Sequence, residues 1–570
     1  MLTLLMTFIT LIFVMLVSYQ LAIKHQSLTA NSYFMASRKL SYAYIAGSMM
    51  LTNTSIDQLI GLNGNSYSNN LSSIAWEVTA VIPMVILALF FLPRFMKERF
   101  ITLPEFISLH YDTVTRRYIS ILLILTYTFV LSPASLYLGA ITINKIFNIQ
   151  ELLDFSYPIT ISFLIVIIGL IGAAYAIFGG LGAVAISDTI NGVFLLFFIF
   201  FVPILGLYIL GNSSFYQGIN IIFHQSPEKL NMIGGVKDTV PFSTIFTGMF
   251  MANLFYWCTN QATIQKCMAA KSLEEGQKGV LLTGFFKLTL PIFLMMPGLI
   301  AWHIFKNNPI IHSDLAYPQL VTMILPLWMK GFFVAVIIGA VMSHFNAIIN
   351  ASSTLITFDF FKPLFLNITD HYLVRFGKLV SIIVALVSIL VAPLLMYAPE
   401  GIYMILRRFT GFFNMPVIAI VLYAFFRSNY TSALAAKIVL IFHAFIYGIF
   451  ILYLNFDKIF NINFIHCMGI LFFIELILLE IIGKFFIVKK NNFVENVSKD
   501  IILMQWPHVK SVSILLIIFL ILLYITFSPF GIANQSMVNG KYFFIILSIL
   551  LGGLTLVILT ESKYYLKCRK

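Results

Sequence analysis

Long apolar stretches recur along this chain between short polar connectors, and they constrain its fold more than any other feature. Hydrophobic residues make up 60% of the chain and charged residues only 10%, against about 25% charged residues in an ordinary soluble domain. A stretch of about 20 apolar residues is long enough to cross a bilayer as a helix. The sequence therefore predicts an all-α, polytopic membrane protein with about fifteen transmembrane helices. The expected spans are approximately 1–23, 41–64, 76–98, 117–147, 157–178, 182–210, 242–268, 278–303, 330–358, 374–398, 401–426, 431–455, 462–487, 511–529 and 542–562.

The positive charges predict the orientation of these spans. The chain has 35 Lys and Arg against 22 Asp and Glu, a net charge of +13. With the N-terminus outside, most of the Lys and Arg fall at cytoplasmic ends and loops, as the positive-inside rule requires. We therefore expect an N-out, C-in protein of the cell membrane. The basic tail KYYLKCRK would then face anionic membrane lipid, so the positive charge points to lipid partners and not to nucleic acid.

Two spans have a polar middle. Span 41–64 contains a near-continuous polar run from Thr52 to Gln58. Polar groups left unpaired in lipid cost several kcal/mol each, so these side chains should face a cavity, a ligand or a protein partner. Asn53 lies about 18 Å along the helix from Ser41, near the membrane midplane. Span 242–268 has a similar interruption, ANLFYWCTNQ, about 17 Å from its start.

The two polar spans suggest an internal repeat. Two five-helix blocks, 41–210 and 242–426, each begin with a polar, interrupted helix, and with the N-terminus outside they cross the membrane in opposite directions. Inverted repeats of this kind are typical of secondary transporters, which bind substrate where the two broken helices meet. Residues 1–40 would add one helix and a cytoplasmic connector, and residues 427–570 would add further helices and the basic tail.

Two common sequence motifs of enzymes do not occur in the chain. It has no G-x-x-x-x-G-K-[ST] sequence for phosphate binding and no H-E-x-x-H sequence for zinc hydrolysis. Its 4 cysteines are scattered without metal-ligand spacing. We therefore expect a transporter and not an enzyme such as a membrane hydrolase or ATPase.

Motifs across residues 30–430 resemble those of the solute:sodium symporter family, most closely its bacterial sodium/galactose members. The matching segments are NSYFMASRKLSY, N-x-x-x-x-Q-x-I-G at 53–61, YLG at 137–139, AYAIFGGLGAV, ANLFYW-x-x-NQ-x-x-IQ at 252–265, AAKSLEEGQKG and NASSTLITFDFFK at 350–362. The resemblance implies a LeuT-like core of five plus five helices that exposes a central site to each side in turn. It implies a Na⁺-coupled symporter for a sugar or a sugar-like polyol.

The resemblance also implies which side chains bind the sugar. Amides, a carboxylate and an ammonium can pair with hydroxyls that both donate and accept. Tyr256 matches the aromatic residue that stacks on the sugar and closes it from the cytoplasm, and Trp76 and Leu62 are assigned with it to the gates. The implied sugar-binding residues are Asn53, Gln58, Glu77, Asn253, Tyr256, Lys287 and, near the tenth core helix, Arg407.

For the ion, the resemblance implies oxygen ligands at the broken helix and on the eighth core helix. These are the carbonyls of Leu51, Thr54 and Ala340 and the hydroxyl of Ser343. Oxygen ligands beside the substrate helix would couple the binding of Na⁺ to that of the sugar. Asp188 falls on the inner path for sodium release.

Three positions depart from the family pattern. His344 replaces a second serine of the sodium site, and imidazole is a poor sodium ligand that titrates near pH 6.5. A proton-coupled or uncoupled carrier, or a solute sensor, is therefore the alternative function. Leu131 replaces an asparagine and Arg407 a glutamine at the sugar site. A guanidinium in place of an amide would suit an anionic sugar derivative.

Simpler interpretations exist for most of these residues. Glu77 could be an interfacial carboxylate. Lys287 and the pair 407–408 could extend to the membrane surface. Asp188 could be a residue near a helix start, and His344 a hydrogen-bonded core histidine without a titrating role.

Overall fold

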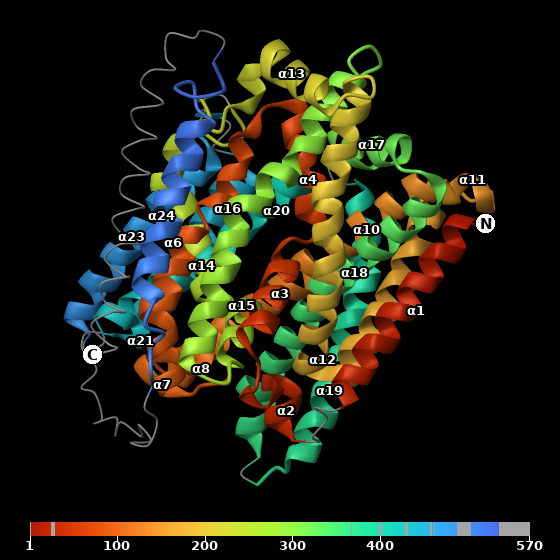
Figure 1. Cartoon of the computed structure of the whole chain (residues 1–570). Helices are drawn as coiled ribbons and strands as arrows, with labels where there is room; N and C mark the ends of the chain where they lie inside the picture. The colour runs from red at the N-terminus through yellow and green to blue at the C-terminus, as the bar shows by residue number, and fades with distance from the viewer. Residues whose placement is uncertain are drawn as a thin grey trace, which may run out of the picture.

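The fold is helical throughout the part of the chain that the computed structural model describes, apart from one isolated β-bridge between Leu40 and Ala270. Eleven of the described helices are long and apolar enough to cross a membrane, and they pack side by side along one direction (Figure 1). The last predicted span, 542–562, and the basic tail lie outside the described residues. These are 2–23, 29–236, 238–365, 367–397, 402–427, 431–455, 459–460, 462–486 and 503–534.

The span predicted at 41–64 is a broken helix. Its first half, α3, covers Tyr42–Asn53, and its second half, α4, covers Ile56–Ser68. Between them Thr54 (φ −77°, ψ 60°) and Ser55 (φ −82°, ψ 175°) leave helical geometry. Helix breaks at membrane depth are tolerated only where the freed backbone groups line a cavity or are buried in protein. The predicted interruption is therefore present, at two residues of the polar run.

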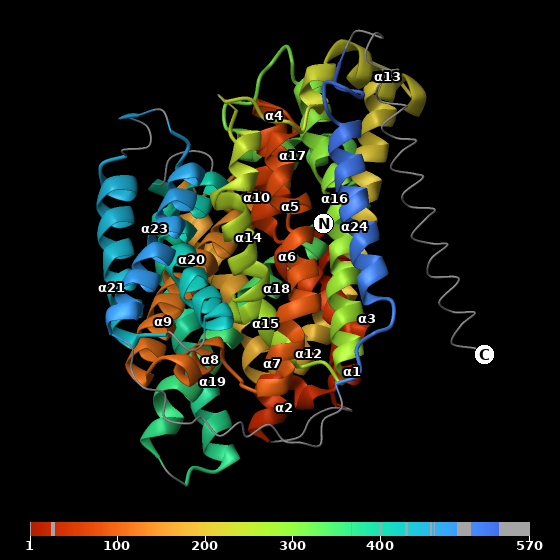
Figure 2. The ribbon, with the colours of Figure 1, turned by 90° about the vertical axis from the view of Figure 1, so that its left-hand side faces the viewer.

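The span predicted at 242–268 is broken in the same way. Its halves are α14 (Gly248–Cys258) and α15 (Gln261–Met268). The Asn260 side chain accepts from the Ala262 N–H at 2.9 Å and so caps the start of α15. The chain rises from α3 to α4 and descends from α14 to α15 in both views, so the two broken helices run in opposite directions (Figures 1 and 2).

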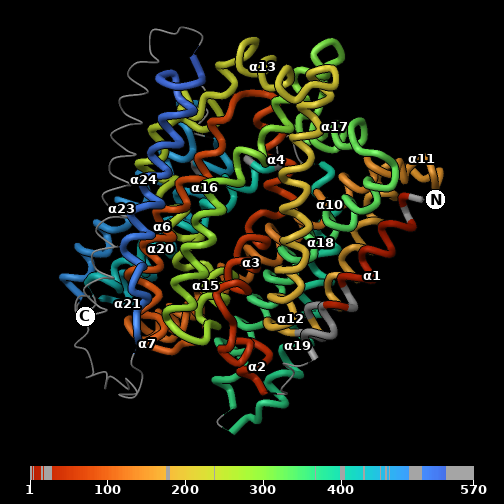
Figure 3. The backbone as a smooth tube through the Cα atoms, viewed as in Figure 1, coloured from red at the N-terminus to blue at the C-terminus, as the bar shows by residue number. Residues whose placement is uncertain are grey.

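The remaining helices surround these two, as the backbone trace shows (Figure 3). In the first half they are α1 (Leu2–Ile23), α2 (Ala30–Met35), α5 (Ala75–Val78), α6 (Val81–Ile86), α7 (Leu92–Glu98), α8 (Leu103–His110), α9 (Thr113–Thr126), α10 (Ser132–Phe147), α11 (Ile149–Leu153), α12 (Tyr157–Leu210) and α13 (Phe215–Gln225). In the second half they are α16 (Leu273–Ile304), α17 (Ala316–Ile324), α18 (Leu327–Leu355), α19 (Asp370–Val391), α20 (Ile402–Phe426), α21 (Ala433–Ile446), α23 (Phe464–Phe485) and α24 (Val509–Thr526).

Two local irregularities follow from sequence. The predicted spans 157–178 and 182–210 are joined within α12 at Gly180, whose φ of 60° and ψ of −170° interrupt the helix. A Cβ at Gly180 would lie 2.7 Å from the Tyr33 carbonyl oxygen, so the position requires glycine. Before Pro133, the chain forms a π-helical turn, Tyr127–Leu131. Proline cannot donate the regular helical hydrogen bond, and the wider turn accommodates this loss.

The C-terminal end of α4 is held by a lysine from the loop after α13. The Lys229 ammonium donates to the carbonyls of Tyr67 at 3.1 Å and Asn69 at 2.7 Å, and it lies 4.6 Å from the Trp302 ring centroid. A cation is favourable at a helix C-terminus, where carbonyls are unpaired. Burial lowers the pKa of Lys229 to about 8.

One asparagine joins α4 to α16. The Asn63 amide donates to the Leu294 carbonyl at 2.7 Å, and its oxygen accepts from the Gly298 N–H at 2.8 Å. A single side chain thus inserts between two groups that would otherwise pair along α16. A Cβ at Gly298 would lie 2.3 Å from the Asn63 carbonyl oxygen, so glycine permits this close approach.

Replacing Asn63 with leucine should destabilise the protein by about 2–4 kcal/mol, because two buried backbone groups of α16 would lose their partner. Thermal unfolding of the purified protein in detergent measures this effect. Asn65→Leu is the matched control, since the Asn65 amide nitrogen has no hydrogen-bond partner in the described structure. Equal unfolding temperatures for the two variants would contradict the proposed role of Asn63.

Candidate functional site

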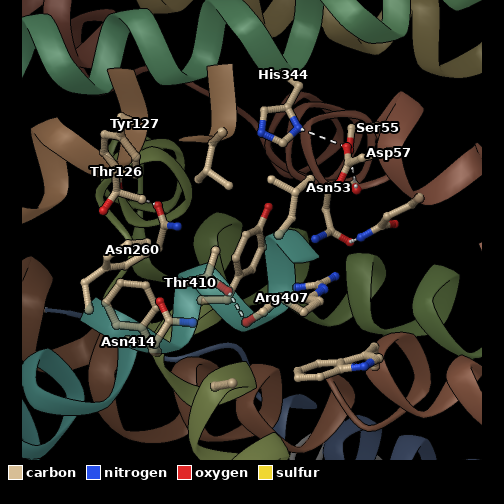
Figure 4. A pocket seen from close by; sticks show the side chains of 18 of the residues that line it. Asn53, Ser55, Asp57, Thr126, Tyr127, Asn260, His344, Arg407, Thr410 and Asn414 are labelled. Carbon is tan, nitrogen blue, oxygen red and sulfur yellow. Dashed lines mark hydrogen bonds and ion pairs between the residues drawn. The ribbon is translucent and has the colours of Figure 1, made fainter. Parts of the chain in front are cut away.

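A narrow cavity of about 60 Å³ lies where the two broken helices meet. Its lining comes from α3, α4, α5, the α9–α10 helix, α14 and the break that follows it, α18 and α20. Polar side chains point into it from several of these elements (Figure 4). The lining residues are Asn53, Ser55, Asp57, Gln58, Trp76, Leu123, Thr126, Tyr127, Leu131, Ala252, Phe255, Tyr256, Asn260, His344, Tyr403, Leu406, Arg407, Thr410, Phe413 and Asn414.

The helix break brings Asn53 and Gln58 together at this cavity. The Gln58 amide donates to the Asn53 side-chain oxygen at 3.2 Å. The Gln58 side-chain oxygen is buried without a hydrogen-bond partner among the described residues. Tyr256, on α14, places its hydroxyl within hydrogen-bonding reach of the Asn53 side chain. Two amides and an aromatic residue predicted to contact the sugar therefore share one wall.

Glu77, Asn253 and Lys287 form a second group just outside the cavity lining. Lys287 and Glu77 make a short ion pair, and each side chain is only 3% exposed. The Asn253 amide donates to the Thr79 hydroxyl at 3.0 Å and to the Trp76 carbonyl at 3.3 Å. The predicted charged ligands are thus buried and paired with each other, although they come from helices 210 residues apart in sequence.

Arg407 connects the two groups. Its guanidinium donates to the Tyr403 hydroxyl at 2.9 Å and lies 3.8 Å from the Glu77 carboxylate. The rings of Trp76 and Tyr403 each lie 4.9 Å from it, a distance at which cation–π attraction contributes. Arg407 therefore faces the site and does not extend to the membrane surface, whereas Arg408 donates to the carbonyl of Ile451 in the π-helical turn after α21.

The residues assigned to the gates lie in different places. Tyr256 and Trp76 line the cavity. Leu62 is fully buried in α4 and is not part of the lining. Their roles as gates stay predictions.

The predicted sodium ligands lie at the break between α3 and α4 and on α18. The carbonyls of Leu51 and Thr54 lie where the regular hydrogen-bond pattern of α3 is interrupted. Ala340 and Ser343 are buried on α18. The Ser343 hydroxyl lies beside Asp188 and makes no hydrogen bond of normal geometry in the described structure. A buried hydroxyl oxygen with spare acceptor capacity, next to a carboxylate, fits a hard cation such as Na⁺.

Asp188 has a partner that the sequence did not predict. The Lys266 ammonium, on α15, lies 3.2 Å from the Asp188 carboxylate and donates to the Ser48 carbonyl at 3.0 Å and to the Thr52 hydroxyl. Ser48 also donates to Asp188 at 2.6 Å. This buried network joins α3, α12 and α15, so Asp188 is more than a residue near a helix start. The sequence did contain one indication of this network, because Lys266 is a charged residue within the predicted span 242–268.

His344 also faces an unexpected partner. Its Nδ1 atom lies 3.6 Å from the carboxylate of Asp57, and both side chains line the cavity (Figure 4). Asp57 contacts the Ser55 hydroxyl as well. His344 is therefore not enclosed in a hydrophobic core. Asp57 belongs to the polar run of 41–64, but its sequence position alone did not mark it as a site residue.

Comparison with known proteins shows what the chain resembles. The profile of the Sodium:solute symporter family matches residues 33–439. The "Uncharacterized symporter YidK" of Escherichia coli is 38% identical over 88% of this chain and 86% of its own length. The "Sodium/glucose cotransporter" of Vibrio parahaemolyticus is 28% identical over 71% of this chain and 76% of its own length. The "Sodium/myo-inositol cotransporter" of Mus musculus is 28% identical over 73% of this chain and 62% of its own length.

Solved structures show the same fold. A substrate-bound, outward-open Na⁺-coupled sialic acid symporter superimposes with a TM-score of 0.71 at 18% identity, over 86% of this chain and 99% of that one. Mhp1, a nucleobase-cation-symport-1 family transporter in a closed conformation, superimposes with a TM-score of 0.54 at 14% identity, over 80% of this chain and 95% of that one. The fold is that of LeuT-like transporters.

The match extends over most of the described core and includes both broken helices. The chain is accordingly a multi-pass protein of the cell membrane, a transporter and not an enzyme, as the sequence predicted. Sodium is the co-transported ion of the matched family, as the sequence predicted. The protein belongs to the sodium:solute symporter family.

Proposed function

We propose that this protein is a Na⁺-coupled symporter for a sugar or a sugar-like polyol and works by alternating access. The observation that carries the proposal is the cavity at the meeting point of the two broken helices, with amide, carboxylate, ammonium and aromatic side chains around it. The names of the glucose and myo-inositol cotransporters among its relatives support this solute class.

The polar groups fit a solute with several hydroxyls. Asn53 and Gln58 offer amide donors and acceptors at the cavity wall. Behind them, the Glu77–Lys287 pair offers an acceptor and a donor that a sugar could reach once Arg407 moves aside. Such a site rejects analogues that lack a hydroxyl, because its own buried groups would then stay unpaired.

Sodium would bind next to this solute. Leu51 and Thr54 supply carbonyls from the break, and Ser343 supplies a hydroxyl from α18. Because Asn53 lies between these two carbonyls in sequence, the ion and the sugar would order the same short segment. Each would therefore raise the affinity for the other, which is the requirement for coupling.

The inverted repeats would supply the motion. We propose that blocks 41–210 and 242–426 form the transport core, that the chain is oriented N-out and C-in, and that segments 1–40 and 427–570 are additions to this core with about fifteen spans in all. The opposite directions of the two broken helices support this arrangement (Figure 1).

A second candidate is a proton-coupled or uncoupled carrier, or a solute sensor, on the same fold. The contact between His344 and Asp57 favours it, because a titratable pair lines the cavity where the family pattern has a serine. Arg407 at the same cavity would suit an anionic sugar derivative.

Uptake into proteoliposomes separates these candidates. We expect an inward tenfold Na⁺ gradient to drive about tenfold accumulation of a labelled sugar at one ion per sugar, and a pH gradient alone to drive none. Glucose, galactose, myo-inositol and glucuronate are tested with the two gradients imposed independently. Accumulation driven by protons only would establish the second candidate, and uptake that ignores both gradients would contradict symport.

A further inference from the structure

Helix α20 presents different residues to the cavity and to the helices outside the core. Arg407, Thr410 and Asn414 line the cavity. On the adjacent flank, α20 contacts α21 and α23, which lie on its side away from α3 (Figure 2). Because α20 is one helix, contacts that hold it against α21 and α23 also set the position of Arg407 relative to Glu77.

Two backbone carbonyls of this flank accept hydrogen bonds from α21 and the turn after it. The Tyr447 hydroxyl donates to the Arg408 carbonyl at 2.8 Å, and His443 Nε2 lies 3.2 Å from the Gly411 carbonyl oxygen. A Cβ at Gly411 would lie 2.3 Å from the Tyr447 hydroxyl oxygen, so glycine permits the close packing. Pro416 cannot donate the helical hydrogen bond to the carbonyl of Phe412, the residue after Gly411, so α20 has one fewer bond of its own beside this contact.

His443 is held in turn by Glu475 of α23. Both side chains are fully buried, and His443 Nδ1 makes a short hydrogen bond to the Glu475 carboxyl group. A carbonyl oxygen can only accept, so Nε2 must carry a proton. The hydrogen bond between Nδ1 and the carboxyl group then contains one further proton, carried by either the ring or the carboxyl group. The His443 ring also stacks on Tyr447 at 5.2 Å.

We propose that His443, Glu475 and Tyr447 form a clamp on α20, called here the α20 clamp, that positions Arg407 at the substrate cavity. The clamp joins α21 and α23 to α20, and it contacts α20 at Arg408 and Gly411, each of which directly follows a residue that lines the cavity. It acts on the site through the backbone of α20, so these three are positioning residues. The proposal rests on the proposed transport function for its biological meaning, but its geometry can be tested without a substrate.

The test measures how readily a cavity thiol reacts. Thr410→Cys introduces the reporter, a water-soluble methanethiosulfonate reagent labels it in membranes, and the chain without the reporter corrects for native cysteines. We expect Glu475→Leu and Tyr447→Phe each to change the labelling rate at least about fivefold, within the usual range of coupling between sites. Glu475→Gln should stay near the unsubstituted rate, because its amide can still donate to Nδ1.

The control variants make the outcome decisive. Rescue by Glu475→Gln shows that the hydrogen bond, and not mere volume, positions α20. If Glu475→Leu does not reach the membrane, Tyr447→Phe, which removes one oxygen atom, decides alone. Unchanged labelling in the variants that insert normally would overturn the proposal. Because no sugar is used, this result is independent of whether the uptake experiment supports the proposed function.

Discussion

Replacing Glu77 with glutamine is expected to reduce sugar uptake about 100-fold and to destabilise the protein by about 3–5 kcal/mol. The stability loss follows because Lys287 would be left buried and 3% exposed without its counter-charge. The uptake loss follows because a charged hydrogen-bond partner of a sugar contributes about 1.5–3 kcal/mol, and each 1.4 kcal/mol is a factor of about ten in affinity. Initial uptake rates and thermal unfolding in detergent measure the two effects separately.

The double variant Glu77→Gln with Lys287→Met separates binding from folding. It removes both charges and so should recover most of the lost stability, as neutral replacements of buried ion pairs often do. Uptake should nevertheless stay low if the pair contacts the sugar. Recovery of uptake together with stability would mean that the pair serves only the fold.

Replacing His344 with serine is expected to lower the half-saturating Na⁺ concentration about tenfold. Serine would restore a second hydroxyl ligand next to Ser343, and one added hydrogen-bonding or ligating oxygen can supply about 1.4 kcal/mol, which is that factor. It would also free the carboxylate of Asp57 from its contact with the imidazole ring. Sugar uptake measured against external Na⁺ at constant ionic strength checks the shift.

Two controls accompany this variant. Ala335→Ser adds a hydroxyl to the same helix, about two turns away from Ser343, and should leave the Na⁺ dependence unchanged. Ser343→Ala in the His344→Ser background should raise the half-saturating concentration again. An unaltered Na⁺ curve in all three variants would place the sodium site elsewhere.

The membrane fold was predictable because the bilayer restricts the alternatives. Polar runs inside apolar stretches are costly unless they line a cavity, and both predicted interruptions are real breaks, after Asn53 and after Cys258. Gly180 likewise lies in the short gap between the predicted spans 157–178 and 182–210, where the structure has an interruption of the helix. These features depend on local sequence alone.

The partners of the buried charges could not be predicted in the same way. Lys266 and Asp188 are 78 residues apart, and only the packing of α3 against both α12 and α15 brings them together. Arg407 and Arg408 are adjacent in sequence and similar in chemistry, yet the rotation of α20 sends one toward the cavity and the other toward the Ile451 carbonyl. Helix rotation and tilt are tertiary properties that one sequence does not report.

The charges around the cavity have a consequence for membrane voltage. Lys266 offsets Asp188, and Lys287 with Arg407 offsets Glu77 with Asp57, so the charges of these six side chains sum to zero when His344 is neutral. A carrier with no net fixed charge at its centre moves no charge when it reorients empty. With Na⁺ and a neutral sugar bound it moves one, worth about 2.3 kcal/mol per 100 mV. The membrane potential would therefore act on the loaded step and leave the return step electrically silent.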